Sequence, residues 1–347
     1  MEYRVGSKLS GILVEQIKVR GLKKVFSVSA SSGKAGQHSG LFKKKQKKNI
    51  VAVDSITFSV EKGETLAFIG PNGAGKSTTI KMLTGILYPT SGSASVAGYN
   101  PWKERLQLAF KIGTVFGQKS QLSFHLPARD SFRLFSRIYE VDGHEYDERL
   151  AKLVEIFDVE DFLDQPLRKL SLGQRMRCEI IASLLHNPEV IFLDEPTIGL
   201  DVVAKRNLRD VLRDLNKEWK TTIFLTSHDT GDIEALCRRT IVVNHGRIVY
   251  DGKTVDLKRK YIKVKRLYAR FEEKLEKFGM KDVTVISEGK YGVFLEIDTQ
   301  KRSIRSVLEE MIDKYSIIDI NVEDPTLEEI ISSMYQEGNE SSAIAKK

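Results

Sequence analysis

Cysteine is scarce in this chain of 347 residues, and long apolar runs are missing. The two cysteines, Cys178 and Cys237, cannot form a disulfide framework, so a reducing compartment is favoured over an extracellular one, and both are expected to be small buried residues. No window reaches the roughly 18 consecutive apolar residues of a membrane span, and no apolar signal stretch follows the first four residues. A hydrophobic content of 41% still excludes a wholly disordered or collagen-like protein.

The chain is basic overall, but its basic residues are unevenly distributed. It has 55 Lys and Arg against 47 Asp and Glu, a formal net charge of +8, which suits a nucleic-acid-binding protein, a membrane-surface protein or neither. The positive excess lies in residues 1–26, 27–49 and 253–270, whereas residues 50–252 are slightly acidic and residues 271–347 are clearly acidic. The central block that carries the motifs below is therefore not itself basic.

Changes of pattern along the chain predict two domains, as its length also suggests. Residues 27–49 are rich in Ser, Gly and Lys, which indicates a flexible basic surface loop, with contact to anionic lipid headgroups as the alternative for its lysine run. Between residues 190 and 246, strand-like runs alternate with helical patterns, which is typical of an α/β domain with a mainly parallel sheet. Residues 253–270 are predicted to be a basic linker to a small second domain.

The most specific motif is a glycine-rich loop between a predicted strand at 66–69 and a predicted helix. Its residues fit G-x-x-x-x-G-K-[ST] and are Gly70, Pro71, Asn72, Gly73, Ala74, Gly75, Lys76 and Ser77. Glycines allow backbone N–H groups to surround a polyphosphate, and the helix N-terminus adds a positive end. Lys76 would reach the β- and γ-phosphates, and the Ser77 hydroxyl would bind Mg²⁺.

Two acidic residues, Asp194 and Glu195, follow an apolar strand predicted at 190–193. Ligands of α/β sheets bind at the carboxyl ends of strands, so Asp194 suits the Mg²⁺ shell and Glu195 suits a base that orients the attacking water. An ordinary acidic loop is the alternative for this pair.

Two weaker patterns need outside support. Ser171 and Gln174 form a capping-box pattern at a predicted helix start, which is also a place where anions bind. His228 follows a predicted strand, where a histidine can contact a phosphate but is more often a loop residue.

In the order in which they occur along the chain, the motifs resemble those of the ATP-binding subunits of ABC transporters over roughly residues 14–252. The glycine-rich loop resembles the Walker A motif, the acidic pair resembles Walker B, and residues 170–174 resemble the signature motif. Three single residues resemble further elements of the family: Gln118 the Q-loop glutamine, Asp201 the D-loop aspartate, and His228 the switch histidine.

The resemblance implies an α/β fold, in which a P-loop NTPase core carries ABC-type antiparallel β and α-helical subdomains, followed by a small α+β C-terminal domain. The domains would be an ABC ATP-binding domain at 1–252, the linker at 253–270 and an accessory domain at 271–347. Residues 322–330 resemble the end of such an accessory domain.

The resemblance also implies that two such subunits enclose two ATP molecules. The glycine-rich loop and Thr78 of one subunit would face Ser171, Gly173 and Gln174 of the other. Leu172 stands where the commoner signature has glycine, so a side chain pointing into the nucleotide pocket would weaken closure.

Roles at the phosphates follow from the same resemblance. Glu195 would position water, Lys76 and His228 would hold the γ-phosphate, and Gln118 would sense Mg²⁺ and the membrane partner. An aromatic residue that stacks on adenine normally precedes Walker A, and Phe26 fits that position best. Phe42 is an alternative, and so is a Phe26 that is simply buried.

The function implied is an ATPase subunit at the cytoplasmic face of the cell membrane, where it powers a separate integral-membrane permease together with a second ATP-binding subunit. The branch that it resembles favours export of a drug-like, lipid or polysaccharide substrate, and no nucleic-acid partner is expected. The alternative is a soluble ABC-type ATPase that acts on nucleic acid or ribosomes.

Overall fold

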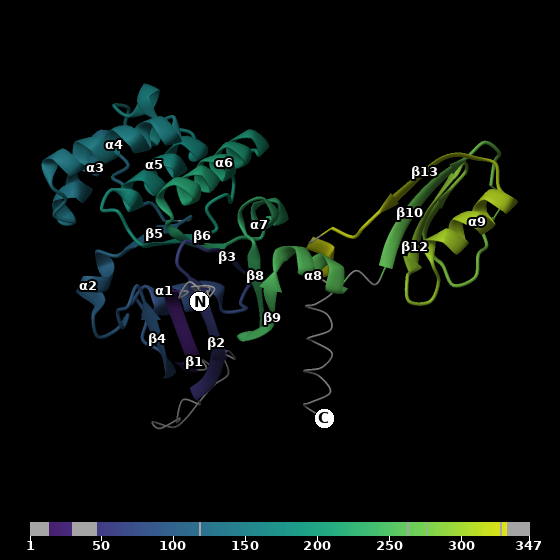
Figure 1. Ribbon diagram of the computed structural model, residues 1–347, viewed down its shortest axis with the longest axis horizontal. Helices are drawn as coiled ribbons and strands as arrows, with labels where there is room; N and C mark the ends of the chain where they lie inside the picture. Colours follow the sequence, from purple (N-terminus) through teal and green to yellow (C-terminus); the bar gives the residue numbers. More distant parts are fainter. Residues whose placement is uncertain are drawn as a thin grey trace, which may run out of the picture. The chain divides into compact units, whose positions relative to one another are not determined.

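The computed structural model describes residues 14–29, 47–117, 119–261, 264–275, 277–326 and 328–331. The chain divides into two compact units, Met1–Asp251 and Gly252–Lys347, each with its own hydrophobic core (Figure 1). Within the described residues, no helix is both long enough and apolar enough to cross a membrane.

A six-stranded sheet in the order β5-β6-β7-β3-β8-β9 forms the centre of the first unit. In this order, each neighbouring pair from β5 to β8 is parallel. The paired strands are short apolar runs because both faces of the sheet are covered. The strands are β3 (Thr65–Ile69), β5 (Ile112–Phe116), β6 (Val190–Asp194), β7 (Thr222–Thr226), β8 (Arg239–Asn244) and β9 (Arg247–Lys253). The carboxyl ends of β3, β5, β6 and β7 therefore meet at one edge of the sheet.

A second, antiparallel sheet packs beside it in the order β2-β1-β4. Its strands are β1 (Glu15–Ser29), β2 (Lys47–Glu61) and β4 (Ser91–Val96). The two sheets share a core in which the Phe58 ring of β2 lies 5.7 Å from the Phe68 ring of β3. Burying a phenylalanine side chain stabilises a fold by roughly 1.5–3 kcal/mol, so this contact fixes the antiparallel sheet against the central one.

The prediction of a loop at 27–49 is wrong at both ends, which belong to strands. Ser27–Ser29 pair with Lys47–Asn49 as the outer part of the β1–β2 ladder, and Ser27 Oγ donates a hydrogen bond to Asn49 Oδ1 at 2.8 Å. An antiparallel partner supplies ladder hydrogen bonds to polar residues whose composition alone indicates a loop. The rest of the predicted loop lies outside the described residues.

Helices cover both faces of the central sheet. Those that follow its strands or lie beside them are α1 (Lys76–Leu83), α2 (Arg105–Ala109), α6 (Val202–Trp219) and α7 (Thr230–Leu236). A separate helical layer, seen above the central strands in Figure 1, comprises α3 (Ala128–Ile138), α4 (Gly143–Phe157), η1 (Glu160–Phe162), η2 (Leu167–Lys169) and α5 (Leu172–Leu184). Helix α5 contacts α3, α4 and α6, so it joins this layer to the core.

The second unit is a small α+β structure. It contains α8 (Thr254–Tyr261), β10 (Val264–Phe271), β11 (Thr284–Gly289), β12 (Gly292–Asp298), α9 (Ile304–Lys314) and β13 (Ile317–Glu323). The strands form an antiparallel sheet in the order β11-β12-β10-β13. Alternate residues of β10 and β12 pack with Val307 and Met311 of α9.

The linker predicted at 253–270 is not a linker in the structure, because helix α8 and strand β10 occupy it. Leu267 and Ala269 are fully buried there, although charged residues surround them in the sequence. The basic side chains pair with acids of the same unit: Lys265 with Asp324 at 2.7 Å, and Arg266 with Glu329. The basic segment and the acidic tail thus belong to one folded unit, in which their opposite charges pair beside a shared hydrophobic core.

Candidate functional site

The glycine-rich loop joins β3 to α1 at the carboxyl edge of the central sheet. Gly75 has a φ of 105°, and a Cβ at this position would lie 2.4 Å from the carbonyl oxygen of Ala52 in β2. Only glycine tolerates both conditions. The last glycine of the motif is therefore required by the local backbone, and it allows the loop to curl above the N-terminus of α1.

Lys76 is buried, and its ammonium group lies against the loop. Its Nζ donates hydrogen bonds to the carbonyl oxygens of Gly70 at 2.6 Å and Pro71 at 3.3 Å. Burial lowers the pKa of Lys76, while the carboxylates of Glu195 and Asp194 oppose that shift. The loop thus holds a partly desolvated cation, which interacts more strongly with a phosphate than a cation in water does.

Asp194 and Ser77 place two side-chain oxygen atoms close together at the same edge. The Ser77 hydroxyl lies 3.4 Å from Asp194 Oδ1, and Thr226 Oγ1 donates a hydrogen bond to the same carboxylate oxygen at 2.5 Å. Mg²⁺ in nucleotide sites takes one or two protein oxygens together with substrate phosphates. The pair fits that requirement, and the described residues contain no group of three or more His, Cys, Asp and Glu that would suit another kind of metal site.

Glu195 from the loop after β6, His228 from the loop after β7 and Lys76 from the start of α1 come together. His228 Nε2 lies 2.9 Å from Glu195 Oε1 and 3.1 Å from Lys76 Nζ. Glu195 has a φ of 56°, a left-handed conformation that costs a non-glycine residue roughly 1–2 kcal/mol. Strained backbone persists at places where the surrounding structure requires it, and here a hydrogen bond from the Glu195 N–H to the Thr226 carbonyl, 3.0 Å long, holds the turn.

Gln118 lies outside the described residues, whereas the residues on either side of it are described. The Gly117 N–H donates to the Asp194 carbonyl at 2.9 Å, beside the last pairing of β5 with β6. The segment that follows is held by Glu179, a residue that the sequence analysis did not identify. Its carboxylate accepts hydrogen bonds from Ser120 Oγ and from the Gln121 N–H, the latter at 3.1 Å.

Glu179 could have been noticed as an acid among apolar residues on a helix. It lies between Cys178 and Ile180, which are fully buried, and burial raises its pKa despite the hydrogen bonds that it accepts. The carboxylate therefore connects α5 to the segment after the predicted Q-loop glutamine. Cys178 is buried as predicted, and burial raises the pKa of its thiol to about 12; Cys237 is also buried.

The signature-like residues lie at the N-terminus of α5. Ser171 Oγ accepts from the Gln174 N–H at 3.2 Å, and Gln174 Oε1 accepts from the Ser171 N–H at 2.9 Å, which confirms the predicted capping box. Gly173 sits against Ala204 of α6, where a Cβ would lie 3.0 Å from the alanine Cβ. These residues face α6 and solvent, and their described side-chain hydrogen bonds join them only to each other.

The D-loop-like segment lies next to the signature-like residues. Leu172 Cδ2 lies 3.0 Å from the point that a Cβ on Gly199 would occupy. The Leu172 side chain therefore lies over the D-loop-like backbone while remaining partly exposed. Asp201 is the N-cap of α6, and its side chain accepts from the Ala204 N–H at 2.9 Å. The two segments therefore form one continuous surface of the first unit.

Phe26 is an exposed residue of β1, which makes the alternative of a buried Phe26 wrong. The residue is 37% exposed, and its ring lies under Lys24, whose Nζ is 5.2 Å from the ring centroid. Its strand partner is Ile50, two residues before Ala52, which touches the glycine-rich loop. Phe42 lies outside the described residues.

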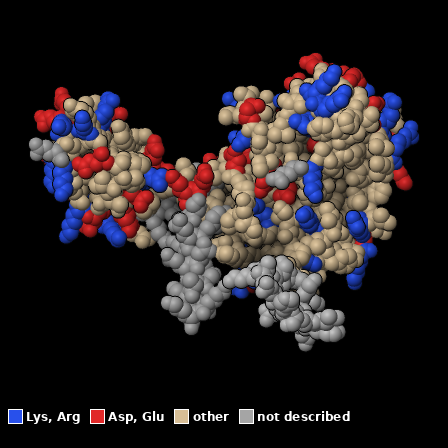
Figure 2. All heavy atoms as spheres, turned by 180° about the vertical axis from the view of Figure 1, so that it is seen from behind, with Lys and Arg blue, Asp and Glu red and all other residues tan. Residues whose placement is uncertain are grey.

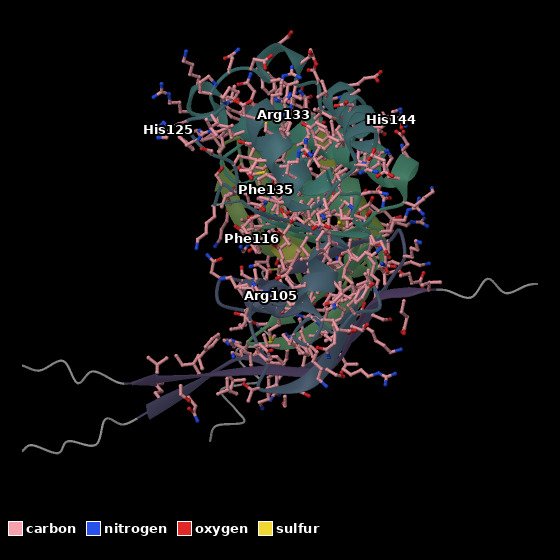
Figure 3. All side chains as sticks on the ribbon, turned by 90° about the vertical axis from the view of Figure 1, so that its left-hand side faces the viewer. Arg105, Phe116, His125, Arg133, Phe135 and His144 are labelled. Atoms are coloured by element: carbon pink, nitrogen blue, oxygen red, sulfur yellow. The ribbon has the colours of Figure 1, made fainter. Side chains whose placement is uncertain are left out.

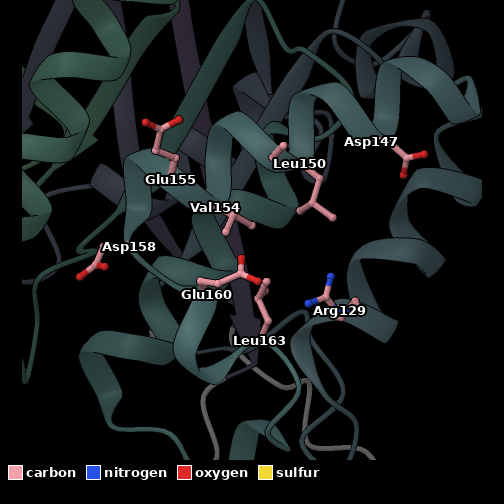
Figure 4. Close-up of a pocket in the computed structure, with 9 residues that line it drawn as sticks. Arg129, Asp147, Leu150, Val154, Glu155, Asp158, Glu160 and Leu163 are labelled. Carbon is pink, nitrogen blue, oxygen red and sulfur yellow. The ribbon is translucent and has the colours of Figure 1, made fainter.

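A hollow of about 610 Å³ lies in the helical layer (Figure 4). Arg129 of α3 lies at its rim and is already paired with Asp164 at 2.7 Å, while Leu150 and Val154 of α4 form an apolar floor. None of the predicted site residues that the structure describes lines it. The hollow is therefore separate from the convergence of Lys76, Glu195 and His228.

The chain is similar to known ATP-binding subunits. The profile of a family described as ABC transporter matches residues 53–198. The ABC transporter ATP-binding protein NatA of Bacillus subtilis is 32% identical over 207 residues, which span 60% of this chain and 84% of that protein. The daunorubicin/doxorubicin resistance ATP-binding protein DrrA of Streptomyces peucetius is 35% identical over 207 residues, which span 60% of this chain and 62% of that protein.

Solved structures agree with these sequence matches and confirm the predicted fold class. A dimeric, post-hydrolysis structure of the ATP-binding cassette MJ0796 bound to ADP and Pi has a TM-score of 0.56 at 25% identity, covering 68% of this chain and 98% of that one. The structure of cbiO1 from Clostridium perfringens, part of the ABC transporter complex cbiONQ, has a TM-score of 0.58 at 26% identity, covering 71% of this chain and 94% of that one.

Proposed function

Because this chain belongs to the ABC transporter family as an ATP-binding subunit, we propose that it powers a separate integral-membrane permease that exports a drug-like, lipid or polysaccharide substrate. The chain is an ATPase whose hydrolysis of ATP is coupled to transport. One observation carries the assignment of the catalytic site: Lys76, Glu195 and His228 converge within hydrogen-bond distance at the carboxyl edge of the parallel sheet.

The proposed chemistry uses these three side chains on the γ-phosphate of ATP. Lys76 and the N–H groups of the glycine-rich loop bind the β- and γ-phosphates, and His228 contacts the γ-phosphate from the loop after β7. Glu195 orients the attacking water and takes up its proton. Mg²⁺, held by Ser77 and Asp194 with Gln118 as the further predicted ligand, would neutralise phosphate charge when bound.

The remaining site residues are proposed to act across a dimer with a second ATP-binding subunit. Ser171, Gly173 and Gln174 present the N-terminus of α5, whose positive end suits the γ-phosphate bound by the partner subunit. Asp201 and the D-loop-like segment share the same surface. The exposure of Phe26 supports its role as the residue that stacks on adenine, with Thr78 beside the phosphates.

An exposed apolar patch on α3 and at the end of α2 supports docking of the permease. Leu134 and Ile138 lie one turn apart on α3 and are 54% and 58% exposed, and Phe110 after α2 is 41% exposed. The Phe110 and Phe135 rings contact Tyr139 at 6.0 and 6.3 Å between centroids, which joins α2 to α3. Figure 3 shows Phe135 on the same side of this unit as Phe116 at the end of β5.

The export direction is supported by DrrA, whose name refers to drug resistance. The alternative, an ATPase acting on nucleic acid or ribosomes, has less support. On the face of the second unit in Figure 2, acidic and basic side chains are interspersed, and the basic residues of β10 are paired with acids. Nucleic-acid-binding surfaces instead concentrate unpaired Lys and Arg on one face. Attachment to the cytoplasmic side of the membrane would follow from binding to the permease.

The experiment is purification of the tagged full chain from membranes in mild detergent, followed by identification of its partners by mass spectrometry. We expect an integral-membrane protein with several spans. The double variant Leu134→Asp/Ile138→Asp should lose this partner and keep basal ATPase activity. The control is Ile312→Asp, which alters an equally exposed residue of α9 in the second unit. Recovery of the chain with ribosomes or DNA, and never with a membrane protein, would contradict the proposal.

A further inference from the structure

Asp232 in the first turn of α7 is a fully buried carboxylate with three side-chain partners. It accepts hydrogen bonds from the hydroxyl of Thr197, from Ser227 Oγ at 2.7 Å and from Arg209 Nε at 2.6 Å. Both carboxylate oxygens are in use, because Thr197 and Ser227 bond to Oδ2 and Arg209 bonds to Oδ1. Residues from three separate segments therefore meet at one side chain.

Two of these partners adjoin the proposed catalytic residues. Thr197 is two residues after Glu195, and Ser227 immediately precedes His228. Glu195 and His228 contact each other at 2.9 Å. Asp232 thus joins the loop after β6 to the loop after β7 just behind the point where these loops bring the two proposed catalytic side chains together.

The third partner extends the connection to the helix that follows the D-loop-like segment. Arg209 of α6 also donates to Asp229 Oδ1 at 2.9 Å, and Lys205 of α6 donates to Asp229 Oδ2 at 2.6 Å. The Asp229 N–H in turn donates to Ser227 Oγ at 2.9 Å. A buried charge is costly unless it is paired and fully hydrogen-bonded, and here the pairing fixes the separation of α6, α7 and both loops.

We propose that Asp232 is a positioning residue for ATP hydrolysis, which holds the Glu195 loop and the His228 loop at one separation. It touches neither ATP nor water in this role and acts through Thr197 and Ser227. A displacement of about 1 Å between reacting groups can cost on the order of a hundredfold in rate. The alternative is that Asp232 only fastens α7 to the sheet, in which case its loss would affect stability and leave turnover per folded molecule unchanged.

The test compares the full-length variants Asp232→Asn, Ser227→Ala and Thr197→Val with Asp210→Asn. Asp210 is the control for loss of a paired acid, because it is a half-exposed acid of α6 paired with Arg213 at 2.8 Å outside this network. We expect Asp232→Asn to lower kcat per folded molecule about 10- to 100-fold, with the KM for ATP close to wild type. Ser227→Ala and Thr197→Val should each cause part of that loss, and the triple variant should lose no more than Asp232→Asn, since the three residues act as one unit.

Hydrogen exchange gives a second measurement that does not depend on turnover. In Asp232→Asn, amides of residues 195–198 and 226–229 should both exchange faster, while Asp210→Asn leaves them unchanged. An unchanged kcat per folded molecule would overturn the proposal, and so would faster exchange in residues 226–229 alone. Because basal hydrolysis and exchange need no permease, failure here is distinguishable from failure of the transport assignment.

Discussion

His186 makes the first unit sensitive to acid, and the size of the effect follows from its surroundings. The histidine follows α5, and its ring stacks on Tyr139, the residue that caps the C-terminus of α3, with 3.9 Å between centroids and an interplanar angle of 7°. Its Nε2 is 3.0 Å from the Ile112 carbonyl, and its Nδ1 is buried and has no hydrogen-bond partner among the described residues. Burial lowers the pKa of His186 from 6.5 to about 4; the hydrogen bond to Ile112 opposes this shift, and the charge of Arg149 adds to it.

The direction of the pH effect follows from this lowered pKa. Between pH 6.5 and pH 4, His186 takes up a proton in the unfolded chain but stays neutral in the folded one. Its contribution to stability is therefore fully present above pH 6.5 and is lost as the pH falls toward 4. With about 1.4 kcal/mol per pKa unit, the loss is about 2 kcal/mol at pH 5 and about 3 kcal/mol at pH 4.

The assay is denaturant unfolding at a series of pH values, followed by tryptophan fluorescence. Both tryptophans, Trp102 and Trp219, belong to the first unit, so the signal reports that unit alone. The variant His186→Phe keeps a flat ring against Tyr139 and removes the titrating group, so its stability should fall less between pH 7 and pH 4. The exposed His144→Gln serves as the control. Equal pH slopes for wild type and His186→Phe would refute the reasoning.

Two further predictions concern the phosphate site. Glu195→Gln should lower basal ATP hydrolysis at least about 100-fold, because the amide cannot take up a proton, while ATP stays bound and dimers accumulate in size-exclusion chromatography; turnover at the wild-type rate would reject the catalytic role. Gly75→Ala should abolish ATP binding measured by a fluorescent nucleotide analogue, because its Cβ would lie 2.4 Å from the Ala52 carbonyl at a φ of 105°. Gly143→Ala, whose Cβ would meet nothing within 4 Å, is the matched control, and binding by Gly75→Ala equal to that of Gly143→Ala would contradict this account of the loop.

The sequence by itself determined the local parts of the site. The glycine-rich loop, the acidic pair after an apolar strand and the capping box at Ser171 were all recognisable, because each depends on neighbouring residues whose backbone conformation has a strong local cause. The core of the second unit was less evident. In β10, buried Leu267 and Ala269 alternate with charged residues, and the charge concealed the strand because the acids that neutralise it lie more than 50 residues later in the chain.

Only the tertiary structure decided which distant residues act together. Parallel strands place their carboxyl ends at one edge in an order unrelated to the sequence, so the contact of His228 with Glu195 and Lys76 depends on β7 lying between β6 and β3. The buried carboxylates Glu179 and Asp232 carry no local pattern, since their partners come from other elements. A hydrogen bond between segments far apart in sequence depends on packing, and packing is a property of the whole fold.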